Sequence, residues 1–435
     1  MGLQSSDGSD ERFSSYVEGL ASVIGHADRV TPLRDYCTGL MMPCSRKSVE
    51  PMAAVQGGGY SARGAGSALL HFVGQAGWSD EKVLAKVCEM VLPEIERHGP
   101  IEAWIIDDTG FPKKGKHSVG VARQYCGQLG KQDNCQAAVL SIANRHASLP
   151  VRYRLYLPQE WATDRGRRRK AHVPEEIIFE TKPEIALEQI RWACQAGLPR
   201  AVVLLDAGYG NHTTLRTQIG ALGLSYTAGI LSSTSVWAPG TKPLPPKRWS
   251  GHGRPPTRLR RSAKHKPVSV KQLAFGLPKR AWRTIGWREG ACERLTSRFA
   301  RVRVRAAHRN ERHGEEWLLI EWPKGDKEPT KYWLSTLPEN IAFERLVYLA
   351  KLRWRIERDY QELKQELGLG HFEGRGWRGF HHHATLCIAA YSFLISERET
   401  IPPSAPGAAA GLPQLALPAD YRPRGAADPN RASHQ

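Results

Sequence analysis

The sequence predicts a mixed α/β fold, in which a core of strands and helices is interrupted by a β-rich insertion and preceded by a helical region. Three observations support this prediction. Apolar runs that end in Asp and then Gly, at 103–110 and 201–208, are typical of strands buried on both faces of a sheet. Residues 183–197 have the spacing and capping residues of a helix. Alternating apolar and charged residues at 300–306 indicate a further, half-buried strand.

Residues 1–95 are expected to form a helical N-terminal domain. The stretches 13–24 and 79–92 have helical apolar spacing, and Ser79 is a candidate N-cap. Glycine clusters at 57–59 and 62–66 separate them. In a chain with 62 Lys and Arg against 43 Asp and Glu, such a domain is a candidate reader of DNA ends. A purely structural cap is an equally good interpretation, because the stretch contains no clear helix-turn-helix signature.

The first part of the core, residues 96–230, is predicted to contain both strands and helices. The expected elements are strands at 103–111, 122–127, 136–143 and 151–157, a helix at 183–197, a strand at 201–206, a helix at 211–222 and a strand at 225–230. Thr181 and Glu184 form a candidate capping box for the first helix. This order would place Asp108 and Asp206 on neighbouring strands, each at the strand's end.

Residues 231–340 are predicted to form a basic, β-rich insertion. The stretch 251–270 contains no acid and is expected to be a loop or extended arm on phosphate; its cations are Arg254, Arg258, Arg260, Arg261, Lys264 and Lys266. In the strand at 300–306, Arg301, Arg303 and Arg305 would share an open face. Solvated surface arginines are the alternative interpretation. Strands at 317–322 and 331–334 would continue a small sheet.

Residues 341–400 are predicted to complete the core. On a helix at 352–364, Arg353, Glu357 and Lys364 fall on one face, so that a carboxylate lies between two cations. Such a pattern is usually an ion-paired surface. A glycine-rich turn at 368–379 and an apolar helix at 381–396 follow. The three consecutive histidines 381–383 point about 100° apart on a helix and cannot chelate one ion together.

The tail 401–435, rich in Pro, Ala and Gly, is expected to be disordered.

The charge balance points to a polyanionic partner. The chain has 62 Lys and Arg against 43 Asp and Glu, a formal net charge of +19 and a pI near 9.7. Double-stranded DNA is the simplest such partner. No apolar run reaches the roughly 18 residues that span a bilayer, and no basic amphipathic helix suggests a membrane surface. The eight scattered cysteines, without CxxC pairs, suit reduced thiols in a cytosol.

Three carboxylates from separate segments form a candidate metal site. Asp108, Asp206 and Glu357 can converge if the Glu357 helix packs across the sheet beside the two strands. A cluster of carboxylates is costly unless divalent cations neutralise it, and oxygen ligands suit Mg²⁺ or Mn²⁺. Two such ions about 4 Å apart activate a water or a 3′-hydroxyl and stabilise the leaving oxygen of a phosphodiester. Arg353 and Lys364 would hold the phosphate backbone nearby.

Several motifs resemble those of a known family. The spacing Arg353-x3-Glu357-x6-Lys364 matches a Tyr-Arg-Glu-Lys signature, and the segments 106–115 and 202–210 look like the aspartate blocks that accompany it. The segment 371–380 looks like the stretch that follows the glutamate in one branch. On these motifs the chain resembles, over most of residues 30–400, the bacterial insertion-sequence DDE transposases of the ribonuclease-H-like superfamily.

The resemblance implies a ribonuclease-H-like catalytic core and cut-and-paste transposition. The ends of a transposon would be hydrolysed to free a 3′-hydroxyl, which then attacks target DNA. Asp108, Asp206 and Glu357 would be the ligands of two Mg²⁺ or Mn²⁺ ions, and Arg353 and Lys364 would contact DNA. Asp108, next to Thr109, fits the family's Asp-Thr pair better than its neighbour Asp107, but the choice between the two aspartates stays open.

Two further features of the family, a signature tyrosine and a base-stacking tryptophan, have no clear counterpart in this sequence. The signature tyrosine is expected at position 350, which is alanine, and Tyr348 would lie on a different helix face. In some relatives a tryptophan of the insertion stacks on a flipped base. Trp317, Trp322 and Trp333 are candidates here, although core packing is the more usual role for any one of them.

The predicted function is therefore that of a DNA transposase acting on terminal inverted repeats and on target DNA. We expect a cytoplasmic bacterial protein, and a homodimer because two ends must be held together. A non-catalytic protein that occupies DNA ends and a stand-alone metal-dependent nuclease are the alternatives. The acidic triad argues against a pure binder, which gains nothing from three buried negative charges near DNA.

Overall fold

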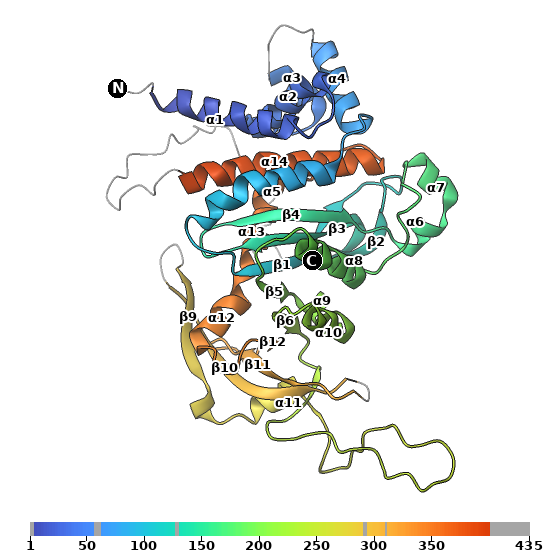
Figure 1. Ribbon diagram of the computed structural model, residues 1–435, viewed down its shortest axis with the longest axis vertical. Helices are drawn as coiled ribbons and strands as arrows, with labels where there is room; N and C mark the ends of the chain where they lie inside the picture. The colour runs from blue at the N-terminus through green and yellow to red at the C-terminus, as the bar shows by residue number, and fades with distance from the viewer. Residues whose placement is uncertain (1–3, 56–61, 127–129, 290–293, 309–310, 401–435) are drawn as a thin grey trace, which may run out of the picture.

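The computed structural model describes residues 4–55, 62–126, 130–289, 294–308 and 311–400. Within these residues, twelve strands form one mixed sheet with helices on both faces (Figure 1). The predicted mixed α/β class is confirmed. The glycine cluster at 57–59 and the tail at 401–435, both named above, lie outside the described residues.

The core half of the sheet follows the predicted order of strands. Its strands are β1 (Ala103–Pro112), β2 (Ala122–Cys126), β3 (Gly130–Ala143), β4 (Ser148–Leu155), β5 (Val202–Leu205) and β6 (Tyr226–Ile230). β1 pairs antiparallel with β3 and parallel with β5, and β5 pairs parallel with β6. β3 also pairs with β2 and with β4. The neighbouring positions predicted for the two strands that carry Asp108 and Asp206 are confirmed.

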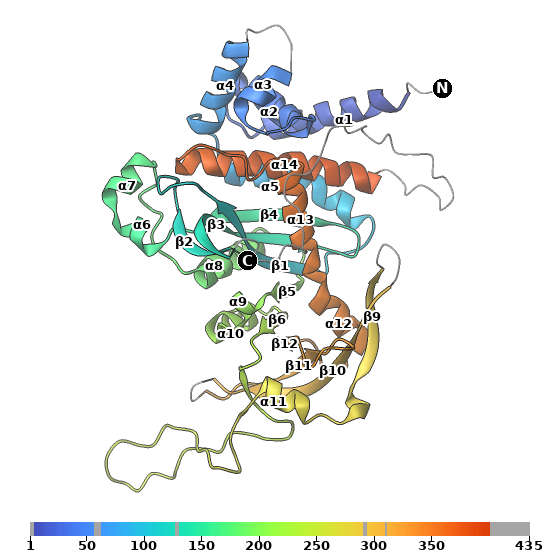
Figure 2. The same cartoon turned by 180° about the vertical axis from the view of Figure 1, so that it is seen from behind.

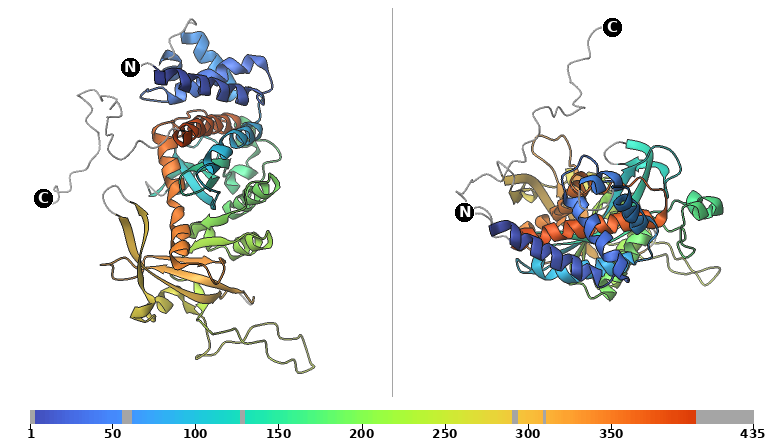
Figure 3. Two further views of the ribbon diagram at one scale, coloured as in Figure 1. Left: turned by 60° about the vertical axis from the view of Figure 1, so that its left-hand side comes forward. Right: turned by 90° about the horizontal axis from the view of Figure 1, so that it is seen from above.

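Helices cover the two faces of this sheet (Figure 3). On one face lie α8 (Lys182–Gln195) and α10 (Thr213–Ala221), and the predicted capping box of Thr181 and Glu184 opens α8. On the other face lie α5 (Asp80–Glu96), α13 (Trp354–Gln365) and the buried α14 (Trp377–Thr400). Ser79 caps α5 as predicted, with its side chain accepting a hydrogen bond from the Lys82 amide. Because both faces are covered, the strands between them can be wholly apolar.

The remaining N-terminal helices pack on the far side of α14. They are α1 (Gln4–Ala21), a 3₁₀ turn η1 (Ala27–Arg29), α2 (Val30–Met41), α3 (Val49–Val55) and α4 (Ala62–Gly74). The Tyr16 hydroxyl donates to the Ala389 carbonyl of α14, and Tyr36 bonds His383. The three histidines each bond separate partners, mostly backbone carbonyls, on different sides of α14. α14 is therefore a central layer between the N-terminal helices and the sheet (Figure 1).

The insertion is not a separate small sheet, which corrects the prediction. Its elements are β7 (Ser235–Trp237), β8 (Val268–Ser269), α11 (Val270–Phe275), η2 (Lys279–Ala281), β9 (Arg283–Glu289), β10 (Arg294–Ala306), β11 (Glu315–Glu321) and β12 (Lys331–Ser335). β12 pairs antiparallel with β6 and extends the core sheet through β11 and β10. The physical reason is that β6 would otherwise expose an unpaired row of backbone groups, which β12 satisfies.

Among the helices that the structure describes, none combines the length and the apolar character needed to cross a membrane.

Candidate active site

The pairing of β1 with β5 determines which aspartates lie side by side. Ile106 is the register partner of Leu205 in this parallel pair, so the next residues, Asp107 and Asp206, are neighbours on the same face. Asp206 directly follows β5, as predicted. Asp108 does not end its strand, because β1 continues to Pro112 along β3. The expectation that both aspartates end their strands is correct for β5 and wrong for β1.

α13 lies across this face and contributes two further charged groups (Figure 2). Arg353 occupies the junction between α12 (Phe343–Leu352) and α13. Its Nη1 atom lies 2.6 Å from Oδ2 of Asp107, and its Nη2 atom lies 2.5 Å from Oε1 of Glu357. The hydroxyl of Tyr360 donates to the Asp107 carbonyl at 3.2 Å. One guanidinium therefore joins an aspartate of the sheet to the glutamate of the helix.

The electrostatics place Asp206 in the same cluster. Burial raises the pKa of Asp107 to about 7; Arg353 opposes this shift, and the neighbouring carboxylate of Asp206 adds to it. Burial lowers the pKa of Arg353, but Asp107, Glu357 and Asp206 outweigh that effect, and the net shift is upward. The carboxyl groups of all three residues thus act on one guanidinium.

Asp108 points to the opposite face of the sheet. Its carboxylate accepts hydrogen bonds from the hydroxyl of Tyr209 and, at 2.6 Å, from Nζ of Lys182. Lys182 also donates to the side chain of Gln136. Successive residues of a strand point to opposite faces, so Asp107 and Asp108 cannot both face α13. The structure brings Asp107, and not Asp108, together with Asp206 and Glu357.

A tight turn holds Asp206. Its side chain caps the short helix α9 (Ala207–Gly210) by accepting a hydrogen bond from the Tyr209 amide at 3.0 Å. Gly210 lies directly against the Gly229 carbonyl of β6, where a Cβ atom would overlap the backbone. The Asp-Ala-Gly-Tyr-Gly sequence therefore packs closely on β6 and fixes the aspartate at the end of β5. The sequence did not reveal Tyr209 and Lys182 as partners of Asp108, because their contacts are long-range.

The three carboxylates match the ligand chemistry of a divalent cation. Hard oxygen ligands suit Mg²⁺ and Mn²⁺. Within the described part of the chain, no three His, Cys, Asp or Glu side chains converge closely enough to hold a metal ion as they stand. The positive charge among the carboxylates is supplied by Arg353, so metal binding requires this guanidinium to release Asp107 and Glu357.

The cations predicted to contact DNA on α13 and β10 make hydrogen bonds and ion pairs within the protein. Lys364 donates to the Gly110 carbonyl at 2.9 Å. Arg301 donates to the Ile341 carbonyl at 2.6 Å and stacks on Trp317. The two other arginines of β10 also bond within the insertion: Arg303 donates to the Glu315 carbonyl, and Arg305 pairs with the Glu315 carboxylate. These arginines are half-buried, so the predicted open face is only partly exposed, and the segment before α12 contacts Arg301.

The long loop between β7 and β8 carries its cations on the surface. Arg258, Arg260 and Arg261 are exposed there, in agreement with the predicted extended arm (Figure 1).

The tyrosine and tryptophan candidates lie in structural contacts. Tyr348 donates to Glu102 at 2.6 Å. Trp317 and Trp333 are each 8% exposed and pack in the core of the insertion. Trp322 is half-buried and packs edge to face against Phe275. Core packing, the more usual role for such residues, is what Trp317 and Trp333 show.

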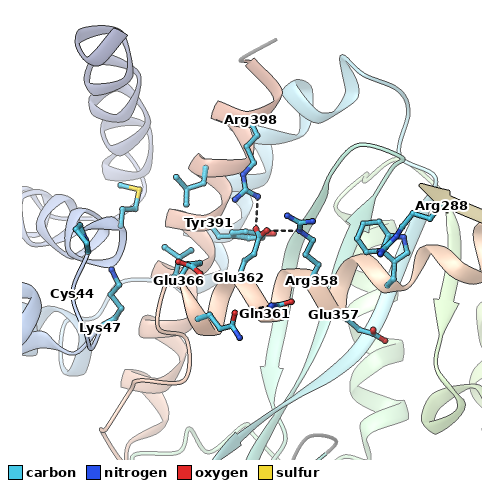
Figure 4. Close-up of a pocket in the computed structure, with 16 residues that line it drawn as sticks. Cys44, Lys47, Arg288, Glu357, Arg358, Gln361, Glu362, Glu366, Tyr391 and Arg398 are labelled. Atoms are coloured by element: carbon cyan, nitrogen blue, oxygen red, sulfur yellow. Dashed lines mark hydrogen bonds and ion pairs between the residues drawn. The ribbon is translucent and has the colours of Figure 1, made fainter. Parts of the chain in front are cut away.

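A cavity of about 1010 Å³ begins beside Glu357 and runs along α13 towards α14 and the loop after α2 (Figure 4). Glu362 projects into it and pairs with Arg358 at 2.9 Å and with Arg398 at 2.8 Å. Lys47 and Arg288 also line it. Of the acidic cluster, Glu357 therefore lines a groove of mixed charge.

Comparison with known proteins identifies the family. The family model described as DDE superfamily endonuclease matches residues 19–294. The chain belongs to the DDE superfamily endonucleases. This membership confirms the resemblance drawn from the motifs, and endonucleases of this superfamily generally use divalent metals. The match includes Asp107 and Asp206 and ends before Glu357, so the candidate role of the glutamate rests on its motif and on its contact with Arg353.

One curated relative gives a more specific comparison. The probable transposase for insertion sequence element IS701 from Microchaete diplosiphon is 32% identical over 172 residues, which are 39% of this chain and 41% of that protein. The chain thus aligns with less than half of the length of this relative.

Proposed function

We propose that this DDE superfamily endonuclease is an insertion-sequence transposase that cuts transposon ends and joins the freed 3′-hydroxyl to target DNA. One observation carries the proposal: Asp107, Asp206 and Glu357 gather around a single guanidinium on one face of the sheet. The name of the IS701 relative and the formal charge of +19 support the same conclusion.

The acidic cluster would hold two divalent ions, Mg²⁺ or Mn²⁺. Bound there, the ions supply an activated water or 3′-hydroxyl and neutralise the leaving oxygen. The chain's own residues provide the ligands and the positioning: Asp107 and Asp206 from adjacent strands, and Glu357 from the helix that crosses them. Arg353, once it releases the carboxylates, is placed to bind the phosphate beside the scissile bond, and Lys364 lies further along the same helix.

The motif and the geometry favour different aspartates of β1 as the first metal ligand. The Asp-Thr pair favours Asp108, whereas the contact with Arg353 and the register with Asp206 favour Asp107. We propose Asp107 as the ligand. Asp108 then has a structural role, in which it joins β1 to Tyr209 of α9 and Lys182 of α8.

DNA would be held by several parts of the chain in a homodimer that brings two ends together. The exposed arginines of the loop between β7 and β8 are proposed phosphate contacts. Arg301, Arg303 and Arg305 could bind phosphate only by exchanging the bonds that they now make within the insertion. The cytoplasm is the proposed location, where the chain would meet bacterial DNA.

The test is a strand-transfer reaction with the full chain. The protein is incubated with duplexes that carry the inverted repeats flanking its gene, a target plasmid and Mg²⁺. Joined products that disappear in Asp206→Asn support the proposal. Binding without cleavage would identify a DNA-end-binding protein, and cleavage without joining would identify a stand-alone nuclease.

A matched pair of variants on α13 tests the glutamate. Glu357→Gln should abolish cleavage and leave end binding largely intact, because it removes a metal ligand but no phosphate contact. Glu366→Gln, at the exposed residue that directly follows the same helix, should cleave normally. Cleavage retained by Glu357→Gln would refute the assignment.

A further inference from the structure

A second basic surface lies at the far end of β1, on segments to which no role has been given above. It is formed by the loop after β1, by α7 (Arg165–Lys170) and by the loop before α14, and we refer to it as the α7 surface. Its six exposed cations are Lys114, Lys116, Arg165, Arg169, Lys170 and Arg375. Among the described residues, no ion pair involves any of these six side chains. In Figure 1, α7 projects from the edge of the sheet next to β2.

The α7 surface is a fixed structure, because two inner arginines anchor its helix. The guanidinium of Arg167 lies 3.8 Å from the ring centroid of Trp161, in α6 (Gln159–Thr163), and donates to the Lys116 carbonyl at 3.2 Å. Arg168 donates to the carbonyls of Ile177 and Pro174 at 2.6 and 2.8 Å. The inner cations therefore face the protein while the outer cations face solvent.

Backbone contacts join the three segments to one another. The Trp377 amide donates to the Ala171 carbonyl at 2.8 Å, and the Val119 amide donates to the Arg375 carbonyl at 3.0 Å. Lys113 reaches from the end of β1 to the Phe372 carbonyl at 2.8 Å. The exposed cations thus come from three distant parts of the sequence and are held together by the fold.

Stability of the protein alone does not explain this clustering. Cations in the last turn of a helix each gain roughly 0.3–1 kcal/mol from the helix dipole, but this effect does not extend to Lys114, Lys116 or Arg375. Two of the nearby acids are already used: Asp164 caps α7, and Glu373 pairs with Arg46. Like charges within a Debye length of about 10 Å repel one another unless a polyanion neutralises them.

The position of the α7 surface fits a duplex that enters the acidic site. β1 leads directly from Asp107 to Pro112, and a strand rises by about 3.4 Å per residue, so the strand ends roughly 17 Å beyond the aspartate. Phosphates on one DNA strand are about 3.4 Å apart along the helix axis, which makes this distance roughly five base pairs. A straight duplex could therefore contact both places.

We propose that the α7 surface binds the phosphate backbone of duplex DNA about half a helical turn from the phosphate in the acidic site. The inference rests on the proposed function for the location of the scissile phosphate. Flexible Lys and Arg side chains on a convex surface bind backbone charge and carry no base sequence information. The duplex is either the transposon end with its flanking DNA or the target DNA.

The test compares two double variants by equilibrium binding without divalent metal. Arg169→Gln with Lys170→Gln removes two charges from the α7 surface. The control, Lys82→Gln with Arg191→Gln, removes two exposed charges from α5 and α8. We expect duplex affinity near 100 mM salt to fall roughly tenfold in the first variant. The negative slope of log K against log salt should become less steep by about 0.9 per lost contact. The control should match the wild type.

The choice of duplexes separates the two DNA sources. Weaker binding confined to transposon ends with flanking DNA assigns the surface to the end, and equal weakening on unrelated duplex assigns it to target DNA.

A second variant, Lys114→Gln with Lys116→Gln, changes only a loop and should repeat the effect if the first variant is poorly folded. Affinity and salt slope equal to the control in both variants would overturn the inference. Cleavage by the wild-type protein is measured in a separate assay. A wild type that binds DNA but does not cleave it would count against the proposed function and not against this inference.

Discussion

Two adjacent aspartates in β1 have separate environments. Asp107 is 14% exposed in its side chain, is bonded by Arg353 and faces α13. Asp108 is bonded by Lys182 and Tyr209 on the other face. Carboxylates one residue apart can thus serve chemistry and architecture separately, because a strand alternates its side chains.

We predict different consequences for the two conservative substitutions. Asp107→Asn should reduce cleavage to the level of Asp206→Asn, because it removes a charged metal ligand. Asp108→Asn should lower the rate by roughly 10–100-fold, as expected for a residue that positions its neighbours. Single-turnover cleavage rates with Mg²⁺ measure both effects, and the reverse ranking would return the ligand role to Asp108.

Arg353 should compete with divalent ions for the carboxylates. In Arg353→Ala we expect tighter binding of Mn²⁺ to the DNA-free protein, because the intramolecular counter-charge is gone, together with slower DNA cleavage. Arg358→Ala, which removes one of the two arginine partners of Glu362 one turn further along α13, should leave Mn²⁺ affinity at the acidic cluster unchanged. Titration calorimetry or the Mn²⁺ resonance signal measures the affinity; unchanged or weaker binding in Arg353→Ala would contradict this role.

The sequence was sufficient to place Asp206 but not to choose between Asp107 and Asp108. An apolar run followed by Asp-Ala-Gly marks the end of a buried strand, and β5 ends there. In β1 the residues before the aspartates are apolar on both faces, so alternation gives no indication of which aspartate faces the helix. Our proposal of Asp107 rests on the register of Ile106 with Leu205 and on the contact with Arg353, and both depend on pairing between distant segments.

At the scale of elements, the packing of the turn after β5 against β6 determines where Asp206 lies in the acidic site. α9 is short and is held between the side chain of Asp206 and the backbone of β6. Gly210 and Gly229 allow the two backbones to approach closely, which no residue with a Cβ atom would permit at position 210. The position of Asp206 therefore depends on this contact.

Gly210→Ala should displace that turn. The added methyl group would overlap the Gly229 carbonyl, so we expect a loss of stability of roughly 1–3 kcal/mol and a larger proportional loss of cleavage. Gly220→Ala in α10, where a Cβ would have no neighbour within 4 Å, should be neutral or gain roughly 0.5–1 kcal/mol. Thermal unfolding and cleavage rates of the two variants provide the comparison; equal behaviour would show that α9 tolerates the displacement.

At the scale of the whole molecule, α14 joins the N-terminal helices to the sheet through buried histidines. Burial lowers the pKa of His381, His382 and His383 to about 4 in each case, although backbone hydrogen bonds oppose the shift. An unfolded histidine has a pKa of about 6.5. Between pH 6.5 and 4 the unfolded chain therefore binds more protons at these positions, and the free energy of unfolding falls as the pH falls.

His383 offers the clearest test of this dependence. It faces Tyr36, Phe372, the Gly368 carbonyl and Cys387, with the charges of Lys113 and His371 further away. His383→Asn should lose stability at neutral pH but depend less steeply on pH between 6.5 and 4.5. The contribution removed is at most about 3 kcal/mol. His71→Asn, at an exposed position of α4, is the control, and denaturant unfolding at several pH values measures the slopes. Parallel curves for the wild type and both variants would refute the prediction.

The organisation of the sheet was predicted in its first half and not in its second. Short-range signals such as the capping box at Thr181 identify elements and their order. The pairing of β12 with β6 joins residues about a hundred positions apart, and nothing in either strand specifies the partner. The expected small sheet was therefore the simplest interpretation of a local pattern, while the observed extension of the core sheet depends on the open edge of β6.

The pairing of β12 with β6 affects what a shortened form of the gene would produce. An in-frame deletion of the insertion would expose the β6 backbone as an open, apolar edge, which is a template for intermolecular strand pairing. Such a product would accumulate as an aggregate and would not persist as a smaller, DNA-binding fragment. Copies that lose the basic insertion should thus be removed by protein quality control, and any truncated derivative that survives in a cell must supply another strand to cover this edge.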